Sequence, residues 1–591
     1  MSTEPLGQAA NCGPAPTTNP VQVLRDVPVP AGDGTALATD VWLPGGRPPR
    51  GGWPVLLQRT PYDKSSSFMS QHVIGMEVLR ALEAGFAVVV QDTRGRYRSA
   101  GAFDPFRHEA GDGADTIAWI RRQPWSDGRV AMYGASYIGA TQLLAASAAP
   151  EGLHALAPQL TSLGLREPWT YQGGALQLGF VLLWVLESLA PPDVERLPAA
   201  DRADAAALLA ELRVDPLAAM SRLPVLTPRL ERLAPYLGDW LRHPPGDDWW
   251  ASFDPAQRAA RIAVPALHIA GTADIFCEGS LAAYQALRAG AAAEGQHLVL
   301  GPWSHGNTSD WQGERWLGYG AASAALDLTG VQLEFFRAVL EGRPPDMPRV
   351  RYFATGSDTW REAADWPVPG TRQAALHLRG GGGLTPGAPG GEEAADRYVS
   401  DPRDPVPTAG GATFLPGLLV ARNSGQRAQD RVEARPDVLV YTGEPLDQDL
   451  EVTGRVVLEL WAASTATDCD WAARLTDVAP DGTSTGIVDG LLRARYRRGG
   501  APLPLQPGRP ERFEVVLGST SHVFRAGHRI RLQVASSNHP RFDRNPQRMV
   551  DPVTATAADF VVAGQTVFHD VRRPSRLLLP TIPAGGRRAV V

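Results

Sequence analysis

The stretch RVAMYGASYIGATQLL, residues 129–144, joins a strand pattern to a helix pattern. RVAMYG has the apolar composition of a buried strand, and the residues from Tyr137 onward repeat with helical spacing. Ser136 stands at the change between the two patterns, with Gly134 and Gly139 on either side. A tight turn from strand to helix holds a serine side chain exposed above the positive end of the helix. The stretch therefore predicts a βα unit that presents Ser136 at its turn.

Comparable units flank this stretch. Two apolar runs predict buried strands before it, a helical pattern lies between them, and a second helical pattern leads into RVAMYG. Three βα units in a row are typical of a mostly parallel sheet covered on both faces. Strand patterns return later in the chain, followed by a long helix. The predicted strands are WPVLLQRT (53–60), FAVVVQD (86–92), VPALHIAGTAD (264–274) and HLVLGPW (297–303), and the predicted helices are 76–85, 112–125 and 330–342.

Changes of composition predict the domain organisation. Residues 161–255 are rich in Leu, Ala and Trp and lack strand patterns, which indicates a helical cap inserted into an α/β-hydrolase catalytic domain of residues 21–160 and 256–346. Residues 347–591 contain many short β-rich runs separated by Gly and Pro, which predicts an all-β jelly-roll domain. Residues 1–20 are polar and Pro-rich and predict a disordered tail.

Composition disfavours several classes of protein. The 57 basic and 63 acidic residues give a formal charge of −6, which offers no basic field for nucleic acid. The three cysteines lie far apart, which disfavours a disulfide framework and a zinc site. No apolar run approaches the roughly 18 residues of a membrane span. We therefore expect a cytoplasmic protein with no metal, cofactor, nucleic acid or membrane as partner, and a homodimer stays open.

Ser136 needs a general base and an orienting acid, because a serine hydroxyl is a weak nucleophile at neutral pH. In α/β-hydrolases these follow in the chain order Ser, Asp or Glu, His, each after a strand. Asp274 ends one predicted strand and His305 follows the next. The strict match to G-x-S-x-G, residues 482–486, lies between two β-rich runs, so we expect Ser484 to have no catalytic role.

An oxyanion formed during acyl transfer needs hydrogen-bond donors. The backbone N–H of Tyr137, directly after Ser136, is the first candidate. The second donor usually comes from the loop after an early strand, which here is RTPYDK, residues 59–64. This loop lacks an HGGG-type backbone donor, so the Tyr62 hydroxyl is the available group.

Several motifs distributed along the chain resemble those of the family of bacterial cocaine esterases, which includes α-amino-acid ester hydrolases and Xaa-Pro dipeptidyl peptidases. The resemblance covers nearly the whole chain. It implies an α/β-hydrolase with a helical cap and a jelly roll, Ser136 as nucleophile, His305 as base, Asp274 as orienting acid, and Tyr62 with Tyr137 as the oxyanion hole. The motifs are RTPYDK (59–64), QDTRGRYRSAG (91–101), residues 111–139, the Asp274 segment, LGPWSH (300–305), EPWTYQGGAL (167–176), WREAADWPVP (360–369), VTGRVVLELW (452–461) and SSNHPRFDRNP (536–546).

The resemblance also implies a substrate class. Trp169, Trp184 and Phe276 match positions that line the acyl pocket in the family, which favours small-molecule esters with an apolar or aromatic acyl group. Relatives that act on amino-acid esters or peptides hold the substrate ammonium with carboxylates, for which Glu167 and Glu278 are the nearest candidates.

Three functions remain open. The leading prediction is a serine hydrolase of carboxylic esters, with some amides as further substrates, acting through an acyl-enzyme. The alternative within the enzyme class is an α-amino-acid ester hydrolase or Xaa-Pro dipeptidyl peptidase. The non-enzyme alternative is a degenerate hydrolase that binds a partner through its jelly roll.

Lys64 is the only lysine, and every other one of the 57 basic residues is arginine. It closes the segment that carries Tyr62. A compact ammonium on a flexible stem fits packed sites that a planar guanidinium does not. We therefore predict that Lys64 pairs with a carboxylate and fixes this loop, with chance retention of one lysine as the alternative.

Overall fold

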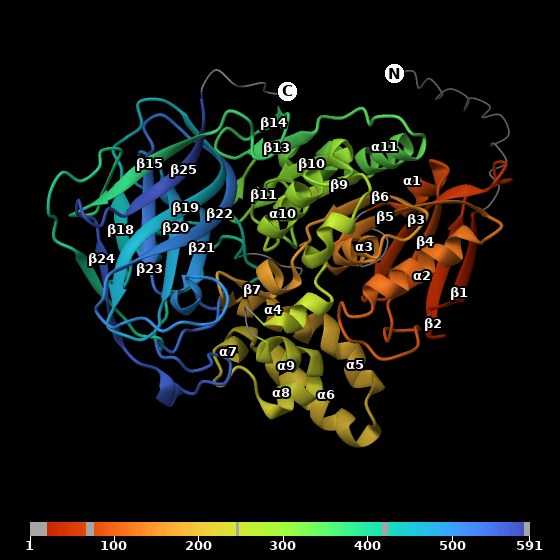
Figure 1. The fold of residues 1–591 in the computed structure, drawn as a ribbon, viewed down its shortest axis with the longest axis horizontal. Coiled ribbons are helices and arrows are strands. Elements are labelled where there is room, and N and C mark those ends of the chain that lie inside the picture. Colours follow the sequence, from red (N-terminus) through yellow and green to blue (C-terminus); the bar gives the residue numbers. More distant parts are fainter. Residues whose placement is uncertain (1–20, 67–75, 244–246, 416–422, 584–591) are drawn as a thin grey trace, which may run out of the picture.

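The computed structural model describes residues 21–66, 76–243, 247–415 and 423–583. Figure 1 shows a mixed α/β part, a helical segment below it in the view, and an all-β part beside both. The predicted disordered tail, residues 1–20, lies outside the described residues. Cys277 and Cys469 are buried free thiols.

A ten-stranded sheet forms the α/β part, in the order β1-β2-β4-β3-β5-β6-β9-β10-β13-β14. The strands from β4 to β13 in this order run parallel, and β1, β2 and β14 are antiparallel to their neighbours. The carboxyl ends of the parallel strands therefore meet at one edge of the sheet. The strands are β1 Gln22–Pro30, β2 Ala36–Leu43, β3 Trp53–Thr60, β4 Ala87–Asp92, β5 Ser126–Ala135, β6 Leu153–Gln159, β9 Ala266–Gly271, β10 Gln296–Gly301, β13 Val350–Ala354 and β14 Thr359–Ala363.

Helices cover both faces of this sheet, as the sequence predicts. Val55 and Leu57 of β3 pack in one apolar cluster with α2, α3 and α10, whereas Leu56 packs in another with α1 and α11. Side chains of a strand alternate between its faces, so one strand supplies both cores. The helices are α1 Val78–Glu83, α2 Glu109–Arg121, α3 Tyr137–Ser147, α10 Cys277–Arg288 and α11 Leu328–Leu340.

A helical segment, residues 165–261, connects β6 to β9. Its apolar side chains form one buried cluster with Tyr62, Tyr137 and Phe414, which belong to other parts of the chain. A short hairpin in this segment, β7 Tyr171–Gln172 with β8 Ala175–Leu176, was not predicted. The segment contains π-helices η2 Leu165–Thr170 and η3 Val185–Leu189, helices α4 Leu178–Trp184, α5 Ala190–Arg196, α6 Ala199–Val214, α7 Pro216–Met220, α8 Pro228–Leu233 and α9 Pro235–Arg242, and 3₁₀-helices η4 Asp248–Ser252 and η5 Pro255–Arg261.

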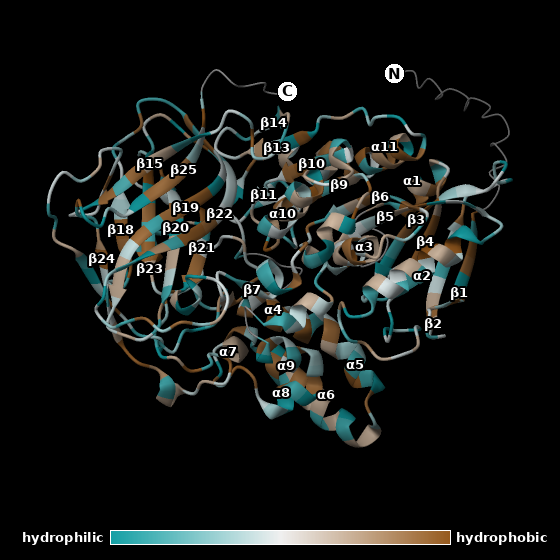
Figure 2. Cartoon of the chain, viewed as in Figure 1, coloured by the Kyte–Doolittle hydropathy of each residue, from teal (hydrophilic) through white to brown (hydrophobic). Residues whose placement is uncertain are grey.

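The all-β part is built on an eleven-stranded sheet in the order β17-β24-β19-β25-β15-β16-β18-β23-β20-β21, with β22 paired to β19. Figure 2 shows hydrophobic residues along the strands of both sheets. The strands are β15 Arg372–Arg379, β16 Gly383–Thr385, β17 Asp396–Ser400, β18 Leu439–Thr442, β19 Leu450–Ser464, β20 Asp470–Val478, β21 Ser484–Arg493, β22 Glu511–Phe524, β23 Arg529–Ala535, β24 Ala563–Phe568 and β25 Arg576–Ile582.

The first sheet extends beyond residue 346, where the sequence analysis begins the β domain. β13 pairs with β10 in parallel from Val350 to Tyr352, and β14 adds an antiparallel edge. β13 and β14 have five residues each, and a run of this length also occurs in the all-β part, as in β17. Pairing with β10 assigns them to the α/β sheet.

Among the described residues, no helix is both long enough and apolar enough to cross a membrane.

Candidate active site

Ser136 lies in a sharp turn between β5 and α3, as predicted from residues 129–144. Its backbone has φ 61° and ψ −130°, a conformation that residues other than glycine rarely adopt. Both flanking glycines are required by close packing. A Cβ at Gly134 would lie 2.3 Å from the Ile138 side chain, and one at Gly139 would lie 2.7 Å from Thr161. The turn therefore depends on Gly134 and Gly139, although the motif is one residue longer than G-x-S-x-G.

His305 connects Ser136 to Asp274. Its Nδ1 lies 2.8 Å from Asp274 Oδ1, and its Nε2 lies 2.9 Å from Ser136 Oγ. A carboxylate only accepts hydrogen bonds, so Nδ1 carries the proton and Nε2 accepts from the serine hydroxyl. The three residues follow β5, β9 and β10, whose carboxyl ends meet at one edge of the sheet. The side chains of His305 and Asp274 are only 5% and 0% exposed, which favours strong electrostatic interaction.

Tyr62 lies in the loop after β3, where its backbone N–H donates to Thr60 Oγ1. Its hydroxyl accepts a hydrogen bond of 3.0 Å from Trp184 Nε1. Burial raises the pKa of the Tyr62 hydroxyl, and its side-chain hydrogen bonds with Trp184 and Ser136 oppose that rise. The hydroxyl is thus protonated at neutral pH, as an oxyanion donor requires.

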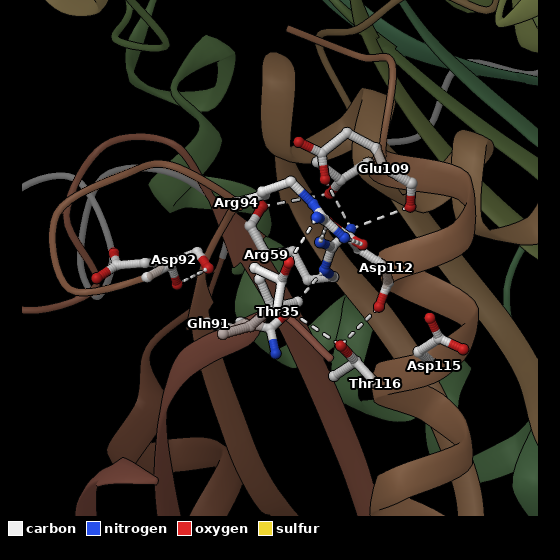
Figure 3. Close-up of polar contacts among 12 residues, drawn as sticks. Thr35, Arg59, Gln91, Asp92, Arg94, Glu109, Asp112, Asp115 and Thr116 are labelled. Carbon is white, nitrogen blue, oxygen red and sulfur yellow. Dashed lines mark hydrogen bonds and ion pairs between the residues drawn. The ribbon is translucent and has the colours of Figure 1, made fainter. Parts of the chain in front are cut away.

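Arg59, Glu109 and Asp112 belong to a buried polar network (Figure 3). Arg59 Nη1 donates to Glu109 Oε2 at 2.7 Å, and the Tyr137 hydroxyl donates to Glu109 Oε1 at 2.9 Å. The same hydroxyl accepts from the backbone N–H of Phe106. Burial raises the pKa of Glu109, and the charge of Arg59 opposes this rise. The Tyr137 hydroxyl thus donates one hydrogen bond and accepts another. These two contacts fix the Tyr137 side chain, which restricts the backbone next to Ser136.

The same network reaches the protein surface through Arg94. This residue donates to both carboxylate oxygens of Asp112 and to Asp33. Asp112 also lies 3.9 Å from Arg59 Nη2. Asp112 therefore links the ion pairs of Arg94 to the ion pair between Arg59 and Glu109.

The three predicted pocket residues pack together, and Phe276 lies next to His305. Trp169 stacks on Phe276 with ring centroids 4.1 Å apart, and Trp184 meets Trp169 edge to face at 5.6 Å. The Phe276 ring contacts His305 at 5.1 Å. Phe414, which was not predicted, places its ring 5.3 Å from His305. Phe414 follows β17 in the all-β part, and nothing in its neighbouring sequence indicates proximity to a histidine in another sheet.

Glu278 lines a pocket together with Asp274, whereas Glu167 does not line that pocket. Glu167 Oε1 accepts from the backbone N–H of Gly173, and Glu278 Oε1 accepts from that of Ser519. Among the described residues, neither carboxylate forms a hydrogen bond or ion pair with the Ser136 hydroxyl. Both line a cavity of about 590 Å³ between the helical segment, α10 and the all-β part.

Ser484, in the strict G-x-S-x-G match, has a different setting from Ser136. It begins β21, and its hydroxyl interacts with Glu433 and Thr476. No helix follows it, in agreement with the expectation that it has no catalytic role.

Lys64 is buried and pairs with carboxylates, as predicted. Its Nζ lies 2.6 Å from Asp26 and 2.7 Å from Asp40, and its side chain is 1% exposed. Its backbone N–H donates to Asp92 Oδ1 at 2.7 Å. Burial alone would lower the pKa of Lys64, but the hydrogen bonds with Asp26 and Asp40 raise it. Lys64 thus fastens the Tyr62 loop to β1, β2 and β4.

We expect Lys64→Arg to lower the free energy of unfolding by about 1–3 kcal/mol, because a larger planar group overpacks a closed site. We expect kcat/KM to fall by about tenfold, since the loop presents Tyr62. Thermal melting and ester hydrolysis measure the two effects. Arg98→Lys is a matched control, because Arg98 pairs with the same Asp26 but is 64% exposed. Wild-type values of both quantities for Lys64→Arg would contradict the prediction.

Comparison with known proteins agrees with this architecture. The family model for X-Pro dipeptidyl-peptidases of the S15 family matches residues 33–307, and that for the X-Pro dipeptidyl-peptidase C-terminal non-catalytic domain matches residues 345–578. Cocaine esterase from Rhodococcus sp. (strain MB1 Bresler) is 37% identical over 585 residues, which cover 95% of this chain and 98% of the relative.

Solved structures show the same fold over the whole chain. An aminopeptidase from a marine sediment Thaumarchaeota archaeon has a TM-score of 0.80 at 25% identity, covering 98% of this chain and 99% of its own. An α-amino acid ester hydrolase has a TM-score of 0.79 at 25% identity, covering 97% and 98%.

The fold and the esterase relatives define a serine hydrolase that acts on esters, and they argue against the non-catalytic binding protein that the sequence left open. Within this class, the chain belongs to the family of bacterial cocaine esterases.

Proposed function

We propose that the enzyme cleaves carboxylic esters through an acyl-enzyme on Ser136. His305 Nε2 takes the hydroxyl proton as Oγ attacks the ester carbonyl, and then gives it to the leaving alcohol when the C–O bond breaks. Water, deprotonated by the same nitrogen, hydrolyses the acyl-enzyme and regenerates the hydroxyl. Asp274 orients the imidazole and stabilises its charged form. The position of His305 within 2.9 Å of Ser136 and 2.8 Å of Asp274 is the observation that carries this proposal.

The oxyanion is held by the Tyr62 hydroxyl and the backbone N–H of Tyr137. An N–H in the first turn of a helix has no acceptor within that helix, so the Tyr137 N–H is available for an incoming oxygen. The burial of both tyrosines supports this role, because donors in a site without water stabilise developing charge more strongly.

The acyl group is apolar or aromatic. Trp169, Trp184 and Phe276 form an aromatic cluster whose Phe276 ring contacts His305, and aromatic acyl groups pack well against such clusters. In this proposal the helical segment is a cap over the catalytic domain, and the all-β part is a jelly roll that contributes Phe414.

The second candidate is an α-amino-acid ester hydrolase or Xaa-Pro dipeptidyl peptidase, which the family match and the aminopeptidase and ester-hydrolase neighbours favour. Such substrates bring a free ammonium group. Glu167 and Glu278 each already bind a backbone N–H group of this chain, which favours the uncharged acyl group.

A panel of p-nitrophenyl esters that differ in the acyl group tests the proposal. We expect kcat/KM for the benzoyl ester to exceed that for the acetyl ester by about tenfold, because ring burial adds transfer free energy. We expect glycyl and phenylglycyl esters to react more slowly than benzoyl esters. A clear preference for the free amine would establish the second candidate instead. Labelling with a fluorophosphonate, followed by peptide mapping, should modify Ser136, and absence of labelling would contradict the acyl-enzyme.

A further inference from the structure

Trp184 is held rigidly at the end of a helix. It is the last residue of α4, and the chain continues as the π-helix η3. Its indole stacks on Trp240 with centroids 5.6 Å apart and on Phe180 at 5.5 Å, with interplanar angles of 10° and 12°. Only 3% of the residue is exposed. Rings on both sides fix the plane of the indole and therefore the direction of its N–H bond.

This N–H bond determines what the Tyr62 hydroxyl can do. An indole nitrogen only donates, so Tyr62 Oη is the acceptor in the 3.0 Å contact with Trp184. The single phenolic proton must then point away from the indole. The Ser136 hydroxyl directs its own proton to His305.

The hydrogen bonds at the site therefore have fixed directions. Trp184 donates to Tyr62, and within the triad Ser136 donates to His305 and His305 to Asp274. The indole only donates and the Asp274 carboxylate only accepts, so neither set of bonds can reverse.

We propose that Trp184 is a positioning residue whose indole N–H fixes the Tyr62 hydroxyl as a donor toward the oxyanion. This inference rests on the proposed function and deepens it. It gives the Trp184 N–H a role in positioning Tyr62 that is distinct from the contact of the Trp184 ring with the acyl group. A hydroxyl that accepts a hydrogen bond is also a stronger donor, since neighbouring bonds in a chain polarise one another.

Trp184→Phe tests the proposal by removing the N–H while keeping an aromatic ring. We expect kcat to fall by roughly 10- to 30-fold, a part of the effect of deleting an oxyanion donor. Replacement of Trp184 by β-(3-benzothienyl)alanine keeps the bicyclic shape and loses only the N–H, so the same fall in kcat is expected with an unchanged KM. Thermal melting verifies that both variants fold. Wild-type kcat for the benzothienyl variant would overturn the proposal.

A double-mutant cycle with Tyr62→Phe measures the coupling between Trp184 and the Tyr62 hydroxyl, which distinguishes a positioning role from packing alone. Once the hydroxyl is gone, Trp184→Phe should change kcat by no more than about threefold. Trp169→Phe is the matched comparator, because its Nε1 is buried and has no hydrogen-bond partner among the described residues. The effects of Trp169→Phe and Tyr62→Phe should multiply. Full multiplication for Trp184→Phe as well would assign Trp184 to packing alone and overturn the proposal.

An arylboronic acid, which forms a tetrahedral adduct with a reactive serine, gives a second test. Trp184→Phe should weaken binding of the boronate by about tenfold more than binding of the corresponding benzoate. Equal weakening of both ligands would overturn the positioning role. Wild-type turnover by Ser136→Ala would instead contradict the proposed function, so the two failures are distinguishable.

Discussion

Ser136→Ala is expected to lower kcat for an aryl ester by about 10⁶-fold, on the scale of other serine triads. The variant lacks the oxygen that forms the acyl-enzyme, so His305 has no proton to accept and no covalent intermediate arises. The backbone of residue 136 keeps its place in the turn, and substrate binding should persist. The measurement is single-turnover and steady-state hydrolysis of the p-nitrophenyl benzoate ester, with preparations free of wild-type enzyme.

Ser484→Ala is the matched control for this experiment. Ser484 satisfies the strict motif but begins β21, and its hydroxyl bonds Glu433 and Thr476. We expect its kcat to equal that of the wild type within about twofold, because distant sites act independently. Normal turnover by Ser136→Ala, or loss of turnover by Ser484→Ala, would reverse the assignment of the nucleophile.

Tyr62→Phe is expected to lower kcat by roughly 10²- to 10³-fold with little change in KM. The hydroxyl bonds the substrate carbonyl weakly in the ground state and the oxyanion strongly in the transition state, so its removal acts mainly on the chemical step. The Tyr137 N–H remains as a second donor, which explains why the effect is smaller than that of Ser136→Ala.

Tyr133→Phe controls for the loss of a buried phenol. Tyr133 lies in β5 and is 1% exposed, but its hydroxyl faces Gln58 within the sheet. We expect a normal kcat for this variant. If Tyr62→Phe also retained kcat within about threefold, the second oxyanion donor would have to be another group.

The fold around Ser136 could be predicted because its signals are local. A strand pattern, a turn and a helix pattern follow one another in residues 129–144, and glycine occurs at the two positions where the backbone approaches Ile138 and Thr161. Asp274 and His305 could be found because each follows a strand, and parallel strands of one sheet end at the same edge. The positions of these residues after successive strands therefore predict that they lie close together.

The remaining features depend on contacts between distant segments. Phe414 approaches His305 from the all-β part, and no local pattern encodes that contact. β13 and β14 have the same length as β17 of the all-β part, and only pairing with β10 assigns them to the first sheet. The hydrogen bond from Trp184 to Tyr62 depends on the direction of one N–H bond, which the order of residues does not determine.

The burial of Lys64 has a consequence for chemical labelling. It carries the only ε-amino group in the sequence, and that group is enclosed by Asp26 and Asp40. An acylating reagent that seeks lysine therefore meets no accessible ε-amine while this loop stays closed. Modification of Lys64 would require opening of the segment that carries Tyr62. The rate of this modification would therefore measure local unfolding next to Ser136.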